Sequence, residues 1–268
     1  RVIMVELNRI ASHLVFFGTY GIDIGAYTTF LYAFREREKI LDLFEEVCGA
    51  RMTYNYIRIG GVMADLPQDW IGKCRSFLEW MKPRFTEYDI LLTGNPIFQD
   101  RTQGVGILTK EKAIAYGITG PNLRGSGFDY DLRKAEPYCG YEKFKFDVPA
   151  GKNGDCWDRY WVRIQEMKES VKIIEQALDG LPEGPTNAKV PRIIRPPVGE
   201  SFACLEAPRG SLGIYLVSDG SDKPYRVHVR APSFINLTIL QEILIGMKVA
   251  DVVAILGSID IVLGEVDR

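Results

Sequence analysis

The chain has 268 residues, of which 46% are hydrophobic and 25% are charged, and its formal net charge is −2. Nucleic-acid-binding domains usually carry a basic surplus, so we expect no nucleic-acid partner. No apolar run reaches the roughly 18–20 residues of a membrane span, since the longest candidate, residues 249–263, is interrupted by Asp251 and Asp260. Any attachment to a membrane is therefore expected to depend on a partner.

The start of the chain is predicted to be a helix. Its apolar residues recur at spacings of four and three, as on one face of an α-helix, at Ile3, Leu7, Ile10, Leu14 and Phe17. A second, polar stripe consists of Glu6, Arg9 and His13, and we expect a hydrogen-bonded structural role for His13. Gly18 and Gly21 are expected to end this helix.

A second helix is predicted over residues 28–47, with Gly49 as its stop signal. It carries the charged run Arg35–Lys39, which has two interpretations. The favoured one is a solvated face with ion pairs at three- and four-residue spacing. The alternative is a contact surface for another protein of a complex.

The middle of the chain is predicted to be mostly helical. A third helix is expected from Pro67 to Met81, with Pro83 kinking or ending it, and Asn95-Pro96 is expected to form a turn. Thr109 can cap a short helix that ends before Gly117. Residues 120–154 predict ordered loops with short elements, and residues 157–181 give the clearest helical pattern in the chain.

The last third of the chain changes character. Short strands are predicted over residues 202–206, 212–217 and 225–229, and helical character returns over 235–247 and 250–256. Together these patterns predict one mostly helical α+β domain. Its helical part is expected over residues 1–181, a small antiparallel sheet over 200–230, and C-terminal helices and a loop over 231–268. Because the five cysteines form no CxxC pair and are odd in number, we expect free thiols in a reducing compartment and no metal site.

One acidic residue stands in an unusual place. Asp23 lies between Ile22 and Ile24 at a glycine-flanked junction of two helices. A carboxylate in apolar surroundings needs a partner or must be protonated. Asp23 is therefore either a helix-capping residue or a carboxylate that holds a basic or proton-donating side chain in a redox pocket.

Several ordered segments together resemble a known family, and they span essentially the whole chain. The family is the hydrogenase-like large subunit of NADH–quinone oxidoreductase (respiratory complex I), which has counterparts in bacterial, mitochondrial and chloroplast-type complexes. The segments that carry the resemblance are ELNRIASHL (Glu6–Leu14), DIGA (Asp23–Ala26), FREREKILDLFE (Phe34–Glu45), GARM (Gly49–Met52), RIGGV (Arg58–Val62), NPIF (Asn95–Phe98), DLRK (Asp131–Lys134), RAPSFINL (Arg230–Leu237) and SIDIVLGEVDR (Ser258–Arg268).

This family is similar to the large subunit of nickel–iron hydrogenases, which implies a hydrogenase-like core. The hydrogenase nickel motif DPCxxCxxH, laid on the present sequence, places its Asp on Asp260, its two cysteines on Val262 and Glu265, and its histidine on Arg268. Valine cannot bind a metal, and one carboxylate does not replace soft thiolates. The resemblance thus implies no metal site in this chain and a vacated nickel cavity that forms part of a quinone pocket.

The resemblance also implies a function and partners. It implies a peripheral-arm subunit whose Asp23 partners a pocket histidine, and whose Asp260, Val262 and Arg268 belong to the quinone pocket, with Arg268 bracing the terminus. Quinone would be the substrate, while FMN and iron–sulfur clusters would belong to other chains. The implied partners are the subunit that bears the terminal iron–sulfur cluster, other peripheral-arm subunits and membrane-arm subunits, on the cytoplasmic side of the inner membrane.

The chain departs from the family at several places, one of them residues 182–199, which are fewer than in many relatives. The HRGxEK segment with its headgroup histidine, and the headgroup tyrosine, are absent, so we expect them upstream of Arg1 and expect the isolated piece to be inactive. Ile261 stands where the family usually has proline after the motif aspartate. Two other functions stay open at this point: a membrane-bound hydrogenase large subunit, disfavoured by the missing thiolates, and a non-catalytic scaffold.

Overall fold

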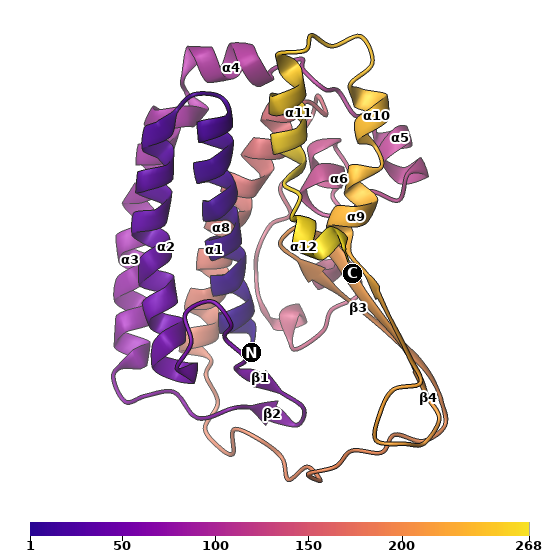
Figure 1. The fold of residues 1–268 in the computed structure, drawn as a ribbon. Coiled ribbons are helices and arrows are strands. Elements are labelled where there is room, and N and C mark those ends of the chain that lie inside the picture. The colour runs from indigo at the N-terminus through magenta and orange to yellow at the C-terminus, as the bar shows by residue number, and fades with distance from the viewer. Residues whose placement is uncertain (268) are drawn as a thin grey trace.

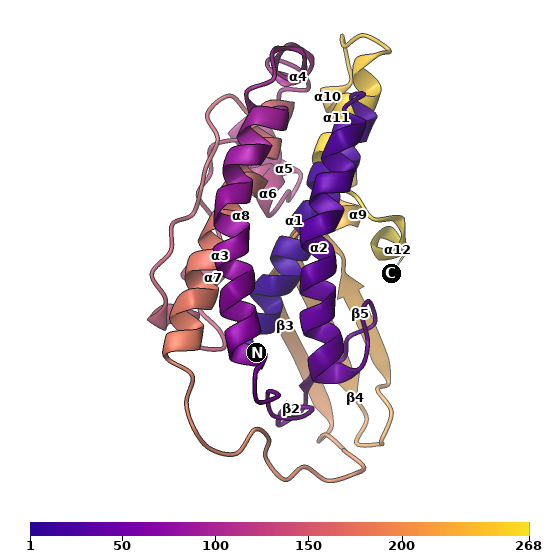
Figure 2. The same cartoon turned by 90° about the vertical axis from the view of Figure 1, so that its left-hand side faces the viewer.

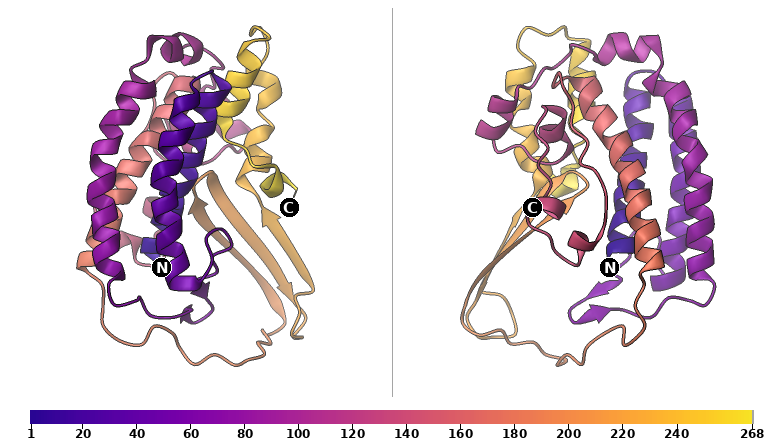
Figure 3. Two further views of the ribbon diagram at one scale, coloured as in Figure 1. Left: turned by 60° about the vertical axis from the view of Figure 1, so that its left-hand side comes forward. Right: turned by 180° about the vertical axis from the view of Figure 1, so that it is seen from behind.

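The computed structural model describes residues 1–267. Its body is a bundle of long helices that lie side by side (Figures 1 and 2). The long helices are α1 (Val2–Asp23), α2 (Tyr27–Cys48), α3 (Trp70–Tyr88) and α8 (Cys156–Asp179). Beside the bundle stands a second layer of short helices, from which a small sheet projects (Figure 3). The fold is α+β and mostly helical, as the sequence predicts.

Helix α1 occupies the centre of the bundle, and its predicted apolar stripe is fully buried. The prediction that Gly18 and Gly21 end the helix is wrong, because α1 continues to Asp23. These glycines let α2 approach closely instead. A Cβ on Gly21 would lie 1.9 Å from the Thr29 hydroxyl oxygen, and one on Gly18 would lie 3.1 Å from the Phe30 Cα.

By length and composition α1 is also apolar enough to cross a membrane, contrary to the sequence-based expectation. An 18-residue window of this helix is 72% buried by the rest of the protein. A core helix passes the same test as a membrane span, and burial inside the bundle accounts for the apolar character of α1.

Helix α2 ends as predicted at Gly49, which adopts the left-handed conformation with φ of 71°. The interpretation of Arg35–Lys39 as a solvated face is only partly right. Glu36 is fully buried, and the Arg35 guanidinium bridges it to Glu87 of α3 at N–O distances of 2.6 and 2.7 Å. This part of the run therefore joins two helices of the bundle.

Helix α3 begins at Trp70, three residues after Pro67, and passes through Pro83 without a break. Proline removes the bond to the carbonyl of residue 79, but Pro83 and Glu79 are both exposed, so that carbonyl faces water. The helix continues into a π-helical turn, η1 (Asp89–Thr93). Asn95-Pro96 is not a separate turn, since the Asn95 side chain caps the next helix by accepting the Ile97 N–H at 2.9 Å.

The predicted short helices and loops of the middle region are confirmed. Thr109 caps α5 by accepting the Lys112 N–H. The short elements of this region are α4 (Pro96–Thr102), α5 (Lys110–Ala115), α6 (Pro121–Gly125), α7 (Leu132–Ala135) and the 3-10 turn η2 (Tyr141–Lys143). A two-stranded hairpin of β1 (Ile57–Arg58) and β2 (Gly61–Val62), which periodicity does not predict, precedes α3.

The predicted strands form an antiparallel sheet in the order β3-β4-β5, with bounds that differ by a few residues from those predicted. They are β3 (Gly199–Ala207), β4 (Gly210–Ser218) and β5 (Arg226–Arg230). Ala207 pairs with Gly210, so Pro208 and Arg209 form a tight turn at the body end of the hairpin. The helix predicted over 235–247 is divided in two, and the C-terminal helices are α9 (Pro232–Leu237), α10 (Leu240–Ile243), α11 (Asp251–Ile259) and α12 (Leu263–Val266).

Candidate functional site

One face of α1 remains open although the helix lies in the core. The partly or fully exposed side chains of α1 follow one stripe at three- and four-residue spacing: Val5, Asn8, Ser12, Val15, Thr19, Ile22 and Asp23. Every other residue of α1 is buried. Helix α2 flanks this stripe on one side and α11 on the other (Figure 1). The stripe is therefore an open face of α1 that ends at Asp23, and its first half is the floor of a groove.

A cavity of about 360 Å³ lies over the first half of this stripe. Asn8, Ser12 and Val15 form its floor. Its walls come from α2, the loop after α2, the β3–β4 turn and α12, and include Arg37, Tyr54, Arg209 and Glu265.

Two polar atoms of this cavity lack a partner within residues 1–267. They are the Ser12 hydroxyl oxygen and the Arg37 Nε, both buried. Most buried polar groups in proteins are hydrogen-bonded, so these two indicate a place where another molecule or chain supplies the partner. The Tyr54 hydroxyl, by contrast, donates to the Asn8 side-chain oxygen.

Asp23 lies at the far end of the open face of α1, beyond the groove, as the last residue of the helix. Its carboxylate is exposed on one side and approaches α11 on the other, where a Cβ on Gly257 would lie 2.9 Å from Oδ2. Partial burial raises the pKa of this carboxyl group. The capping interpretation is wrong, because Ala26 occupies the N-cap position of α2 and makes no side-chain bond.

Asp260 ends α11 in the left-handed conformation, with φ of 60°. Its carboxylate is nearly buried between two arginines, 3.5 Å from Arg163 Nε and 3.4 Å from Arg209 Nη2. Arg209 Nε also donates to the Asp260 backbone carbonyl at 3.1 Å. Arg209 therefore connects the C-terminal run to the cavity, whereas the Asp260 side chain does not line it.

Val262 is 39% exposed and lines a separate cavity of about 520 Å³ next to Glu265. Glu265 belongs to both cavities and accepts the Ser233 N–H at 3.1 Å. Within residues 1–267, no group of three or more His, Cys, Asp or Glu side chains is arranged to hold a metal ion. Arg268 lies outside the described residues.

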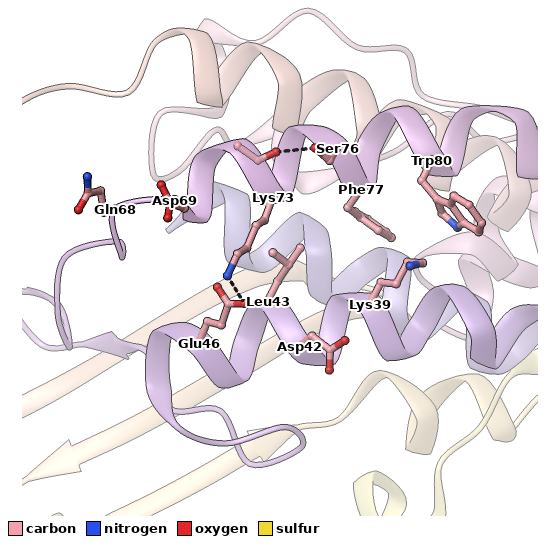
Figure 4. Close-up of a pocket in the computed structure, with 11 residues that line it drawn as sticks. Lys39, Asp42, Leu43, Glu46, Gln68, Asp69, Lys73, Ser76, Phe77 and Trp80 are labelled. Atoms are coloured by element: carbon pink, nitrogen blue, oxygen red, sulfur yellow. Dashed lines mark hydrogen bonds and ion pairs between the residues drawn. The ribbon is translucent and has the colours of Figure 1, made fainter.

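Another cavity, larger than these two at about 910 Å³, lies elsewhere (Figure 4). It is an open groove between α2 and α3, edged by Lys39, Asp42 and Trp80, and the Glu46 carboxylate pairs with Lys73 across it at 2.8 Å. It contains none of the predicted site residues. We favour the α1 groove because two of its buried polar atoms lack partners within residues 1–267, whereas Glu46 and Lys73 of the α2–α3 groove pair with each other.

The groove adds three polar residues that the sequence does not single out: Arg37, Tyr54 and Arg209. In the sequence, Arg37 belongs to a charged run and Arg209 to a hairpin turn. The polar stripe of Glu6, Arg9 and His13 is not part of this groove, since all three are fully buried. As expected, His13 is hydrogen-bonded, with Nε2 2.9 Å from Glu166 Oε2.

Comparison with known proteins agrees with the resemblance seen in the sequence. Residues 23–198 and 190–268 match the family model described as "Respiratory-chain NADH dehydrogenase, 49 Kd subunit". Proteins named as the D subunit of NADH-quinone oxidoreductase are 57% identical in Desulforamulus reducens, 55% in Clostridium beijerinckii and 53% in Bacillus anthracis. Each match covers 100% of this chain and 72–73% of the relative. The chain belongs to the 49 kDa subunit family of the respiratory NADH dehydrogenase, as a component of an oxidoreductase complex.

Proposed function

We propose that this chain contributes one wall of the quinone-reduction pocket of NADH–quinone oxidoreductase, next to the terminal iron–sulfur cluster of a neighbouring subunit. Electrons from NADH would reach the quinone through flavin and clusters held by other subunits. This chain would place the headgroup and shape its proton supply. The complex would couple quinone reduction to proton translocation through its membrane-arm subunits.

The observation that carries the proposal is the open stripe of α1, which ends at Asp23 and passes under a cavity with unpartnered polar atoms. The stripe includes the partly exposed apolar residues Val5, Val15 and Ile22, and uncovered apolar surface is typical of sites where another molecule or subunit binds. The relatives are named as subunits of an NADH-quinone oxidoreductase, and a headgroup with two carbonyl oxygens suits the donors Ser12, Arg37 and Arg209.

The predicted residues within residues 1–267 each have a role in this proposal. Asp23, exposed at the end of the open face of α1, would hold a basic or proton-donating side chain of a neighbouring segment. Asp260 would act through Arg209, which it fixes from behind the cavity wall. Val262 and Glu265 stand where a hydrogenase would have nickel thiolates. They line the cavity of about 520 Å³, which would form part of the quinone pocket.

The position of the chain in the cell follows from this role. We propose that it lies in the peripheral arm on the cytoplasmic side of the membrane, in contact with the cluster-bearing subunit, other peripheral-arm subunits and membrane-arm subunits. A hydrogenase large subunit is disfavoured because Val262 cannot bind nickel and Glu265 provides only one carboxylate. A pure scaffold is the remaining alternative, and the following variant separates it from a pocket role.

Changing Asp23→Asn in the intact complex is expected to lower NADH–quinone reductase activity by about tenfold or more, since positioned acid–base groups contribute at least that much. Assembly and NADH oxidation by an artificial acceptor at the flavin should be unchanged. The matched control is Asp179→Asn, because Asp179 is also the last residue of a long helix and exposed, and pairs only with Arg75 at the surface. Quinone reductase activity that is equal in both variants would support the scaffold alternative.

A further inference from the structure

The sheet β3-β4-β5, which projects from the body of the molecule, has two faces of different character (Figure 1). Because side chains alternate between the faces along a strand, the pairing register assigns each residue to one of them. The polar face includes the ionisable side chains of Glu200, Arg226, His228 and Arg230. The apolar face has no ionisable side chain, and its members are Ser201, Ala203, Leu205, Leu212, Ile214, Leu216, Val227 and Val229.

This separation indicates which face of the sheet is buried in the folded protein. Antiparallel sheets commonly pack an apolar face against other elements and turn a polar face to water. On the apolar face, Ile214 pairs with Ala203 on one side and with Val229 on the other, so the apolar side chains form rows across all three strands. The pattern therefore predicts that another element packs on this face.

Residues 1–267 leave the apolar face open. The side chains of Val227, Ile214 and Leu205 are 49%, 43% and 38% exposed. No member of this face belongs to the buried hydrophobic clusters of the described residues. Uncovered apolar surface of this kind marks a place where another chain segment or molecule binds.

The edges of the sheet are open as well. Among the described strands, β3 and β5 each pair only with β4, so each has an outer edge without a neighbouring strand. A free edge beside an uncovered apolar face invites aggregation, which folded proteins avoid by covering or pairing such strands. A cover that is already present when the subunit folds would remove this hazard before assembly.

The length of the relatives indicates where such a cover comes from. This chain covers only 72–73% of each relative compared above, so about a quarter of each relative lies outside the match. A segment of the same polypeptide is tethered to the sheet, and its packing is therefore an intramolecular step that needs no encounter with another subunit.

We propose that the apolar face of the sheet is covered by a segment of the subunit's own polypeptide, from the part of the full-length subunit that corresponds to this additional quarter. The segment would pack apolar side chains against Ile214 and Val227. Leu212 and Val229 belong to the apolar face and also line the cavity of about 520 Å³ with Val262 and Glu265. The covering segment therefore also borders this cavity. The proposal does not depend on quinone binding.

The first test is photocrosslinking in the intact complex with Ile214→p-benzoylphenylalanine, followed by mass spectrometry of the crosslinked peptides. We expect residue 214 to be joined to a residue of its own subunit that lies outside the present 268. The control is His228→p-benzoylphenylalanine on the polar face, which should not give this crosslink. Crosslinks from residue 214 that reach only another subunit, or none that reach beyond the 268 residues, would overturn the proposal.

The second test uses a smaller side chain, so that a bulky probe does not itself displace the cover. Val227→Cys and His228→Cys are compared in the full-length subunit without its partners, and maleimide labelling of each thiol is followed by peptide mass spectrometry. These neighbouring positions lie on opposite faces, and the covered position 227 is expected to react at least about tenfold more slowly than 228. Equal labelling rates in urea would exclude a difference in intrinsic reactivity. Equal rates in the folded subunit would mean that the face is open and would contradict the proposal, whatever the outcome for quinone.

Discussion

Replacing Arg124 with methionine is expected to lower the free energy of unfolding of the subunit by about 3–5 kcal/mol, the usual cost of leaving buried charges without their partner. The variant removes the cation that Glu166, Glu206 and Asp131 share in the interior. It also removes the N–H that the Tyr130 carbonyl accepts at 2.9 Å. The measurement is denaturant unfolding of the full-length subunit, with its abundance in the assembled complex as a second readout.

The chain offers a matched control for this variant. Arg51 also contacts three carboxylates, those of Glu38, Asp42 and Glu45, but this group lies at the surface. Solvent screens such pairs, so Arg51→Met is expected to change stability little. Similar losses in the Arg124 and Arg51 variants would mean that the interior cluster is not the strongly coupled ionic centre inferred from its burial.

A loss of similar size is expected when Tyr160 of α8 is replaced by alanine. The ring is fully buried and packs edge-on against Phe98 at a centroid distance of 4.8 Å. The rings of Phe16 and Phe17 of α1 lie near it at larger centroid distances, 6.4 and 6.3 Å. Removing a buried aromatic ring leaves a cavity and typically costs about 3–5 kcal/mol. Because Tyr160 joins α8 to α1 and α4, the variant should also loosen the end of α1 that bears Asp23.

Tyr160→Phe distinguishes the contribution of the ring to stability from that of the hydroxyl. The hydroxyl lies 3.0 Å from the Thr93 Oγ1, and losing this single hydrogen bond is expected to cost about 1 kcal/mol. Both variants are compared by denaturant unfolding of the full-length subunit. A Phe variant as unstable as the Ala variant would place the stabilising effect in the hydrogen bond and contradict the packing argument.

Much of the fold could be predicted from the sequence, because α2 buries one face and α8 leaves only a narrow stripe uncovered, so that both show the helical period. The strands β3 and β5 are mostly exposed on both faces, and their β-prone residues and bounding turns indicate them instead. Prediction fails where a residue serves a tertiary contact. Gly18 and Gly21 resemble stop signals, but they stay helical because α2 packs on them. Pro83 remains inside a helix because the carbonyl it leaves free is exposed to water.

The site is less predictable than the fold, for a similar reason. Asp23 is recognisable as an acid between isoleucines, and it does lie at the end of the open stripe of α1. Arg209 is not recognisable, because its importance depends on Asp260, which lies far along the chain and meets it only through the fold. Likewise the sequence shows Glu6 and His13 only as a polar stripe, and the fold brings Arg133 and Glu166 against them.

Our claim that quinone binds along the open face of α1 can be tested by photolabelling of the intact complex with a quinone that carries a photoreactive group near its ring. We expect label on residues 8–23 of α1 or on the 207–209 turn, and loss of this label with excess unmodified quinone. Competable label confined to the α2–α3 groove around Trp80, or no competable label on this chain, would contradict the claim.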